Sequence, residues 1–339
     1  MSSSKLYPES EVNNRFDTAV ILRNTENPSS VAIANNIYKK ITKGERNISS
    51  VYIEDSAQSP EGYAPLLNSY DQSNKNAWLV VGGDGTFSQF ANSRPKSPVM
   101  IVPGGYANDT YKMLYGSSTL HYPGYILAHG QRTVIHPLEI NSYKSGSDLN
   151  SIITTLDVLD LENQISPDDS ELAFGYWGIG LSGLVSNHLA QNNVREVRDK
   201  LSSLGKFIYS GKLISSIIPK SPPLEIVQSR GSRIRHEVLF ANGNRMAKLI
   251  RFGGVDIREN RAALLELEKS THTSFISLLG KSALLEKYTD FGTNTYHIFG
   301  VKSDKDMYSQ RDGEAKKQES GTVFKIGISD YGVNVITVR

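Results

Sequence analysis

The sequence predicts two domains of different class: an N-terminal α/β domain with a parallel sheet and a C-terminal β-sandwich domain. Up to residue 137, short apolar runs alternate with segments of helical periodicity, whereas beyond it β-type runs follow one another with few helices. We therefore assign residues 17–137 to the first domain and 138–339 to the second, whose last strand can return to the first. A chain of 339 residues is long enough for two cores.

The first domain begins after a polar leader that ends near Phe16. Its predicted strands are residues 18–22, 49–53, 77–80 and 98–102. A helix that ends at Gly44 is predicted after the first strand, because apolar residues recur at helical spacing. These residues are Val31, Ala34, Tyr38 and Ile41. Each of the last two strands also leads into a helix, and residues 122–128 add a short helical piece.

The second domain is predicted to be an antiparallel sandwich. The β-type runs are residues 151–161, 171–177, 234–240, 262–268, 295–301, 322–328 and 333–338. Two predicted helices, 184–201 and 206–217, interrupt them.

The sequence GGDGT at residues 82–86 follows a predicted buried strand directly. Its glycines allow positive φ and the close approach of a phosphate, and backbone amides at a helix start favour anions. We expect Thr86 to cap a helix that begins near Phe87. Asp84 would be a like charge beside a phosphate, which suggests that it handles a metal ion or a proton.

A second glycine turn, residues 103–109, follows the next predicted strand and leads into a helix at 110–114. One such turn is ordinary in α/β proteins and can be merely a tight connection. Two consecutive turns, each with an acidic residue and each at the carboxyl end of a strand, favour a nucleotide or polyphosphate site.

With these motifs the chain resembles the catalytic domain of diacylglycerol kinases, sphingoid-base kinases and bacterial lipid kinases. NAD kinases and phosphofructokinases share only GGDGT. Further landmarks follow in the family's order: residues 178–181 (GIGL), 241–243 (ANG) and 311–314 (RDGE). The resemblance implies a second domain that holds the lipid, and a cleft between the domains.

The resemblance also implies ATP and Mg²⁺ as cofactors and assigns roles to residues. Asp84 is the candidate for coordinating Mg²⁺ or for orienting the acceptor hydroxyl, which the sequence does not separate. Glu314 is the candidate general base, although Asp312-Gly313 is also a hairpin signal that would leave Glu314 merely solvated. The expected nucleotide-binding residues are Asn24, Gly82, Gly83, Gly85, Thr86, Gly104, Gly105, Asn108 and Asp109.

Asn24 and the segment 27–30 stand where the lipid kinases have an Asn-Pro turn, but the family's following glycine is absent. A helix cap at Ser29 or Ser30 explains this segment better. Asn24 remains a candidate for contacting the nucleotide.

The chain departs from the family at several positions. Tyr106 and Ala107 replace Thr and Gly of the second turn, Gln89 stands where Glu is frequent, and Ser182 replaces an aspartate. Residues 260–265 lack the Asp-Asp-Gly element that bacterial diacylglycerol kinases associate with a structural Mg²⁺, so we expect that metal site to be missing. Either the substrate or the regulation differs, or activity has been lost.

Residues 178–183 also fit the dinucleotide-binding pattern G-x-G-x-x-G. A βαβ unit would need a strand after the helix that follows, whereas residues 204–218 are typical of a second helix. We therefore expect a turn, or a close approach of backbone to the active cleft, rather than a dinucleotide site.

Composition indicates a cytoplasmic protein. The 37 Lys and Arg against 35 Asp and Glu argue against nucleic acid as a partner, and no apolar run approaches the ~18 residues that span a membrane. Zero cysteines exclude disulfides. Residues 205–220 combine apolar residues with three lysines and no acid. This segment could lie at an anionic membrane surface, but an amphipathic helix packed on the sandwich is the favoured interpretation.

The sequence therefore predicts an ATP-dependent lipid kinase, with diacylglycerol as the expected acceptor and phosphatidate as the product. A sphingoid base or a soluble acceptor such as NAD is the enzymatic alternative. The departures also leave open a catalytically weakened protein that binds nucleotide or lipid. A homodimer is compatible with the sequence, which does not determine the oligomeric state.

Overall fold

The computed structural model describes residues 16–44, 48–57, 60–73, 75–105, 108–116, 123, 126–127, 130–144, 148–158, 166–191, 194, 203–246, 250–251, 255–272 and 289–337. The chain forms two compact units. Unit 1 consists of Met1–Val134 with Val333–Arg339, and unit 2 is Ile135–Gly332.

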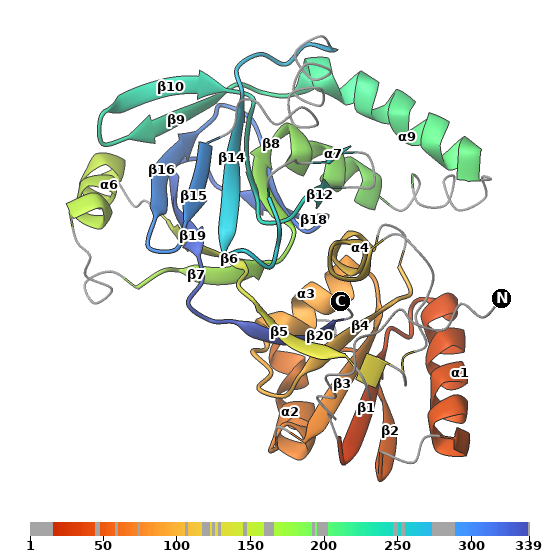
Figure 1. Ribbon diagram of the computed structural model, residues 1–339. Helices are drawn as coiled ribbons and strands as arrows, with labels where there is room; N and C mark the ends of the chain where they lie inside the picture. Colours follow the sequence, from red (N-terminus) through yellow and green to blue (C-terminus); the bar gives the residue numbers. More distant parts are fainter. Residues whose placement is uncertain are drawn as a thin grey trace, which may run out of the picture. The chain divides into compact units, whose positions relative to one another are not determined.

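Unit 1 is built on one six-stranded sheet with the order β2-β1-β3-β4-β20-β5 (Figure 1). The strands are β1 (Thr18–Arg23), β2 (Ser50–Asp55), β3 (Asn76–Gly82), β4 (Val99–Pro103), β5 (Gln131–Ile135) and β20 (Val333–Thr337). Strands β1 to β4 pair in parallel, and the C-terminal β20 joins β4 in the same direction. Their carboxyl ends therefore share one edge, where both glycine turns begin.

The helices of unit 1 whose bounds the structure describes are α1 (Pro28–Gly44), η1 (Pro60–Tyr63), α2 (Ala64–Tyr70), α3 (Asp84–Asn92) and α4 (Asp109–Tyr115). Helix α3 buries Phe87 and Phe90, and the Phe90 ring centroid lies 4.9 Å from that of Trp78 on β3. The predicted strands and the helices after the first, third and fourth of them are confirmed. The sequence did not predict α2 or β5. Of the helical piece expected at 122–128, residues 123, 126 and 127 are described, and all three are helical.

Unit 2 contains two six-stranded sheets whose assigned pairings are all antiparallel. The first, sheet B, has the order β10-β9-β16-β19-β6-β7, with strands Gly231–Arg235, Leu224–Gln228, Tyr296–Lys302, Thr322–Ile328, Leu138–Tyr143 and Asp169–Ala173. The second, sheet C, has the order β15-β14-β11-β8-β17-β18, with strands Thr289–Gly292, Arg261–Leu267, Glu237–Ala241, Tyr176–Gly180, Met307–Arg311 and Glu314–Gln318. A short hairpin joins β12 (Arg245–Met246) to β13 (Ile250–Arg251).

The two sheets pack face to face through one apolar core. The ring centroids of Trp177 in sheet C and Phe324 in sheet B are 5.0 Å apart. Phe240 of sheet C stacks on Phe299 of sheet B, with a centroid distance of 6.1 Å. All four side chains are buried. This packing makes unit 2 a β-sandwich.

One expectation for the second half is wrong. Residues 151–161 were expected to form a strand, but α6 (Leu149–Val158) is a helix. Its β-branched residues favour strands, but apolar positions spaced by three and four residues turn one face toward sheet B, where Gly300 leaves room for Leu149. The runs 171–177 and 234–240 are β structure as expected, but each extends over two strands, with breaks at Phe174-Gly175 and at His236.

Two further helices, α7 (Leu181–Ala190) and α9 (Ser203–Ile217), pack against each other, and η2 (Ile218–Lys220) follows. A helix rather than a strand follows α7 along the described chain, as expected if residues 178–183 are not a dinucleotide fingerprint. The apolar side chains Leu213, Ile214 and Ile217 of α9 contact the α7 cluster, whereas Lys212 is exposed. This arrangement agrees with an amphipathic helix packed on the protein. Among the described residues, no helix is long and apolar enough to cross a membrane.

Candidate functional site

The two glycine turns lie side by side at the carboxyl ends of β3 and β4. The backbone amides of Gly104 and Gly105 donate to the carbonyl oxygen of Gly82, at 2.7 and 3.2 Å. A Cβ on Gly105 would lie 2.3 Å from the Cα of Gly83, closer than any side chain tolerates. Glycine is therefore required because the two turns touch through their backbones.

Asp84 joins the two turns. It is the first residue of α3, and its carboxylate oxygens accept hydrogen bonds from the amides of Asp109 at 2.9 Å and Thr110 at 2.8 Å. These are the first two residues of α4, whose amides have no partner within the helix. The carboxylate therefore has a structural reason to be in this turn, besides the metal or proton role expected from the sequence.

The predicted start of the helix after GGDGT is wrong. Helix α3 begins at Asp84, with Gly83 in an extended conformation as its N-cap, so Thr86 lies in its first turn. The Thr86 hydroxyl instead accepts a hydrogen bond from Nδ2 of Asn24, at 3.2 Å. Asn24 thus reaches the turn from the end of β1.

Asn108 fixes the second turn. Its backbone is left-handed, with φ of 51°, a conformation that asparagine tolerates. Its side chain accepts from the Gly105 amide at 2.9 Å and donates to the Gly105 carbonyl oxygen at 2.8 Å. Tyr106 and Ala107, where the chain departs from the lipid-kinase pattern, lie outside the described residues.

Asn27 connects the end of β1 to the second turn, a contact that sequence reasoning missed. Its Nδ2 donates to the carbonyl oxygen of Gly104 at 2.6 Å, and its Oδ1 accepts from the amide of Ser29 at 3.0 Å. Helix α1 begins at Pro28, so Asn27 is the cap and the expectation of Ser29 or Ser30 is wrong. The Asn-Pro pair was the available signal, because proline is favoured at the first helical position.

In unit 2, Asp312 and Gly313 form the turn between β17 and β18. Both have positive φ, 48° and 93°, as in a tight two-residue hairpin. The buried Asp312 carboxylate accepts hydrogen bonds from the amides of Phe174, Gly175 and Tyr176, at 2.7 to 3.0 Å. Burial raises the pKa of Asp312 to about 6, against the opposing effect of these amides and of Arg311.

Asn242 binds the same 174–176 segment and also the backbone at His136. The amides of Asn242 and Gly243 donate to the carbonyl oxygen of Gly175 at 2.8 and 3.2 Å, and Nδ2 of Asn242 donates to that of His136 at 2.8 Å. The landmarks at 241–243 and 311–314 therefore meet at the connection between β7 and β8. Together they fix the base of the turn that carries Glu314.

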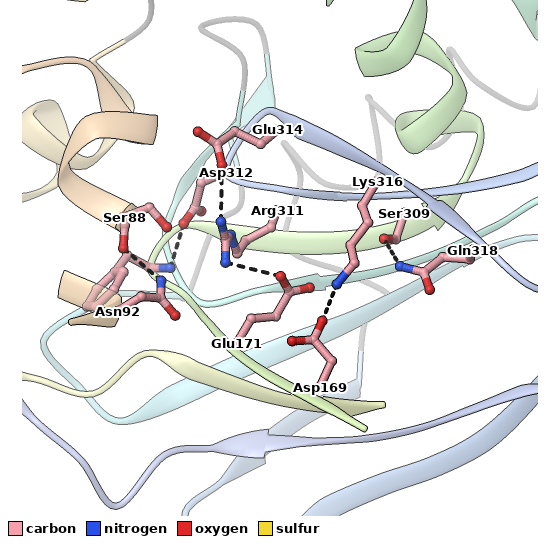
Figure 2. Close-up of polar contacts among 11 residues, drawn as sticks. Ser88, Asn92, Asp169, Glu171, Ser309, Arg311, Asp312, Glu314, Lys316 and Gln318 are labelled. Carbon is pink, nitrogen blue, oxygen red and sulfur yellow. Dashed lines mark hydrogen bonds and ion pairs between the residues drawn. The ribbon is translucent and has the colours of Figure 1, made fainter. Parts of the chain in front are cut away.

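Glu314 is the first residue of β18 and belongs to a cluster of charged side chains (Figure 2). Nη2 of Arg311 donates to Oε2 of Glu314 at 3.1 Å, and Nη1 donates to Oε2 of Glu171 at 3.1 Å. Burial raises the pKa of Glu171, and Arg311 opposes that shift. Glu171, which the sequence did not single out, comes from β7 of the opposite sheet.

The glycine segment at 178–181 surrounds a buried carboxylate. Glu237 of β11 accepts from the amide of Ser182 at 2.7 Å and from its hydroxyl at 2.5 Å. Burial raises the pKa of Glu237 to about 8, and the bonds from Ser182 oppose that shift. A Cβ on Gly178 would lie 2.6 Å from Oγ of Ser182, so this glycine makes room for the pair. No sequence pattern had indicated Glu237.

The predicted site residues thus fall into two groups. The turns of unit 1 bring together all the expected nucleotide-binding residues, with Asp84 among them. Glu314 lies in unit 2, in the cluster with Arg311 and Glu171.

No family model matches the chain, and no curated protein matches it. Solved structures do. A structure from Bacillus anthracis str. Sterne that is assigned as a diacylglycerol kinase has a TM-score of 0.61 and 15% identity, over 95% of this chain and 98% of that one. A diacylglycerol kinase structure from the same organism has a TM-score of 0.58 and 16% identity, over 95% and 97%.

A more distant likeness is to yeast NADH kinase complexed with NADH. Its TM-score is 0.53 and its identity 9%, over 96% of this chain and 84% of that one. The chain therefore has the fold shared by diacylglycerol kinases and NADH kinase, in agreement with the resemblance carried by its motifs.

Proposed function

We propose that this protein is an ATP-dependent lipid kinase that transfers the γ-phosphoryl group to a hydroxyl of diacylglycerol and so forms phosphatidate. The observation that carries the proposal is the pair of glycine turns joined by the Asp84 carboxylate, in a chain with the diacylglycerol kinase fold. Such an arrangement offers the backbone amides at the start of α3 to a polyphosphate.

The start of α3 is the part of the turns best suited to the phosphates. The first amides of a helix have no acceptor within it, which for α3 concerns Asp84, Gly85 and Thr86. The amides of Gly104 and Gly105 already bond to Gly82, so these two residues shape the cradle. Asn24 and Asn108 hold its two sides.

The donor set is compatible with Mg²⁺. This ion is usually held by one or two carboxylates together with substrate phosphates and water. Each oxygen of Asp84 accepts one amide in the structure and has a second lone pair, so Asp84 can contribute one ligand. The ion would neutralise charge on the phosphates during transfer.

Glu314 is the proposed general base. Its carboxylate would accept the proton of the lipid hydroxyl as the oxygen bonds to the γ-phosphorus and ADP leaves with the electrons of the broken bond. Its side chain is 38% exposed, so it is accessible to a substrate. Arg311 holds it from one side.

A soluble acceptor such as NAD is the second candidate. The likeness to yeast NADH kinase, with a TM-score of 0.53, favours it, whereas the agreement with the diacylglycerol kinase structures is higher. Both candidates share the phosphate site and differ in the acceptor.

The test supplies labelled ATP and Mg²⁺ with diacylglycerol, a sphingoid base or NAD. We expect label in phosphatidate, and its loss in Asp84→Asn and Glu314→Gln. The matched controls are Asp55→Asn and Glu319→Gln, whose side chains are 59% and 70% exposed. Transfer to NAD alone would select the second candidate, and nucleotide binding without transfer to any acceptor would contradict both.

A further inference from the structure

We propose that Arg311 is a positioning residue, which fixes the carboxylate of Glu314 at the β17–β18 turn and is itself fixed by Glu171. This inference rests on the proposed function, because it gives a role to a residue beside the proposed base. It concerns the side chain of Glu314, whereas Asp312 fixes the backbone beneath it.

The geometry of Arg311 is that of a bridge between two carboxylates. One terminal nitrogen bonds to Glu171 and the other to Glu314, each at 3.1 Å (Figure 2). The planar guanidinium presents its nitrogens in a rigid fork, so anchoring one of them restricts the other. A lysine ammonium is a single point charge and cannot hold both carboxylates in this way.

Burial makes the anchor firmer than the residue that it holds. The side chains of Arg311 and Glu171 are each only 15% exposed, whereas that of Glu314 is 38% exposed. The buried pair therefore resists rearrangement, while the carboxylate that it supports stays partly exposed. This asymmetry is what a support for a reactive carboxylate requires.

The alternative role of Arg311 is to close the edge of the sandwich. Arg311 and Glu171 come from sheets C and B, and the neighbouring pair of Lys316 and Asp169 also links β18 to β7. Lys316 and Asp169 are 48% and 43% exposed and pair with each other. At the opposite edge, Arg235 bonds to Glu266 at 2.9 Å. Ion pairs between the two sheets therefore also occur away from the proposed general base. The loss of such a pair provides a control.

The turn itself is already fixed without Arg311. Asp312 is held by three amides, and the amide of Gly313 donates to Oε1 of Gln310 at 3.1 Å. Loss of Arg311 would therefore leave the backbone position of Glu314 unchanged and remove the ion pair that orients its carboxylate. The predicted defect is one of orientation rather than of folding.

The experiment compares Arg311→Gln with Lys316→Gln, the matched loss of a cross-sheet cation. Two readouts are used: kcat and KM for diacylglycerol and ATP, and the carboxyl-carbon NMR resonance of Glu314, identified by its disappearance in Glu314→Gln. We expect Arg311→Gln to lower kcat by about tenfold to a hundredfold, with both KM values nearly unchanged, and to shift the Glu314 resonance. Lys316→Gln should change neither.

Three further variants guard against misfolding. Arg311→Ala should regain part of its kcat when millimolar guanidinium is added, and Arg311→Lys should not recover the wild-type value. Glu171→Gln keeps a hydrogen-bond acceptor, and removing its charge should shift the Glu314 resonance while the protein stays folded.

An unshifted Glu314 resonance in Arg311→Gln would overturn the inference, as would equal losses of kcat in Arg311→Gln and Lys316→Gln. If the wild-type protein phosphorylates no acceptor, the proposed function fails. The resonance then decides alone whether Arg311 positions Glu314.

Discussion

The carboxylate of Asp84 accepts a hydrogen bond from the backbone amide of Asp109, at 2.9 Å, across two turns whose acidic residues lie 25 positions apart in the sequence. A second bond, to the amide of Thr110, uses the other oxygen. One side chain of the first turn thereby completes the start of the helix after the second. The proposed nucleotide site is built by this relationship as much as by its glycines.

The first prediction concerns Asp84→Asn. The amide group of asparagine has one acceptor oxygen, so one of the two backbone amides would face a donor. We expect the free energy of unfolding to fall by about 1–3 kcal/mol. ATP affinity should fall with it, because α4 would no longer be fixed. Urea unfolding and calorimetric titration with ATP measure the two effects. In Asp55→Asn, an exposed pair with Arg23 is lost, and stability should change little.

The second prediction concerns the contact between the turns. Gly105→Ala places a Cβ 2.3 Å from the Cα of Gly83, so the backbone must shift. Overpacking of this kind costs about 1–3 kcal/mol, and nucleotide binding should weaken. Gly211→Ala is the matched change in helix α9, where the new Cβ would meet nothing within 4 Å. That variant should gain about 0.5–1 kcal/mol, and a loss of the same size in both would contradict the explanation.

The third prediction is a dependence of stability on pH from Glu237. Burial raises its pKa from 4.5 to about 8, so the folded state keeps a proton that the unfolded state releases. The contribution of Glu237 is therefore fully present below pH 4.5 and is lost as the pH rises toward 8. Glu237→Gln should flatten this fall. Unfolding curves recorded between pH 5 and 8 for both proteins test it, and equal slopes would show that Glu237 is ionised in the folded state.

The fourth prediction concerns Asp312. The buried carboxylate of Asp312 accepts hydrogen bonds from three backbone amides, and asparagine lacks its charge. We therefore expect Asp312→Asn to lower the free energy of unfolding by about 2–3 kcal/mol. The exposed Asp330 provides the control, since Asp330→Asn should leave stability nearly unchanged. Thermal unfolding of the two variants gives the comparison. A similar, small effect in both would mean that the 174–176 segment is held mainly by Asn242.

The sequence best predicts the strands and turns that depend on residues adjacent in the chain. The strands β1, β3 and β4 are apolar runs followed by glycines or asparagines, and these local signals also revealed the phosphate-site candidates. Helix α6 shows the limit of local signals, because its β-branched residues outweighed the spacing that packs it on sheet B. These residues form a helix because they pack on sheet B, and the local sequence pattern carries no information about that sheet.

The second group of site residues was less predictable for a different reason. Asp312 and the amide of Gly175 are 137 positions apart, and Arg311 and Glu171 are 140 apart. No spacing rule connects such pairs, since only the register of the two sheets brings them together. The resemblance to lipid kinases identified Glu314. It identified neither the hydrogen bonds that the Asp312 carboxylate accepts beside it nor the ion pair of Glu314 with Arg311.

The proposed activity is the transfer of a phosphoryl group from ATP to a lipid hydroxyl. The most direct measurement follows label from γ-labelled ATP into phosphatidate, with wild-type protein, Glu314→Gln and the control Glu319→Gln, all with Mg²⁺ and diacylglycerol in mixed micelles. We expect transfer by wild type and by Glu319→Gln, and a loss of about 10²–10⁴-fold in Glu314→Gln. Equal transfer by Glu314→Gln and wild type, or no label in any lipid, would contradict it.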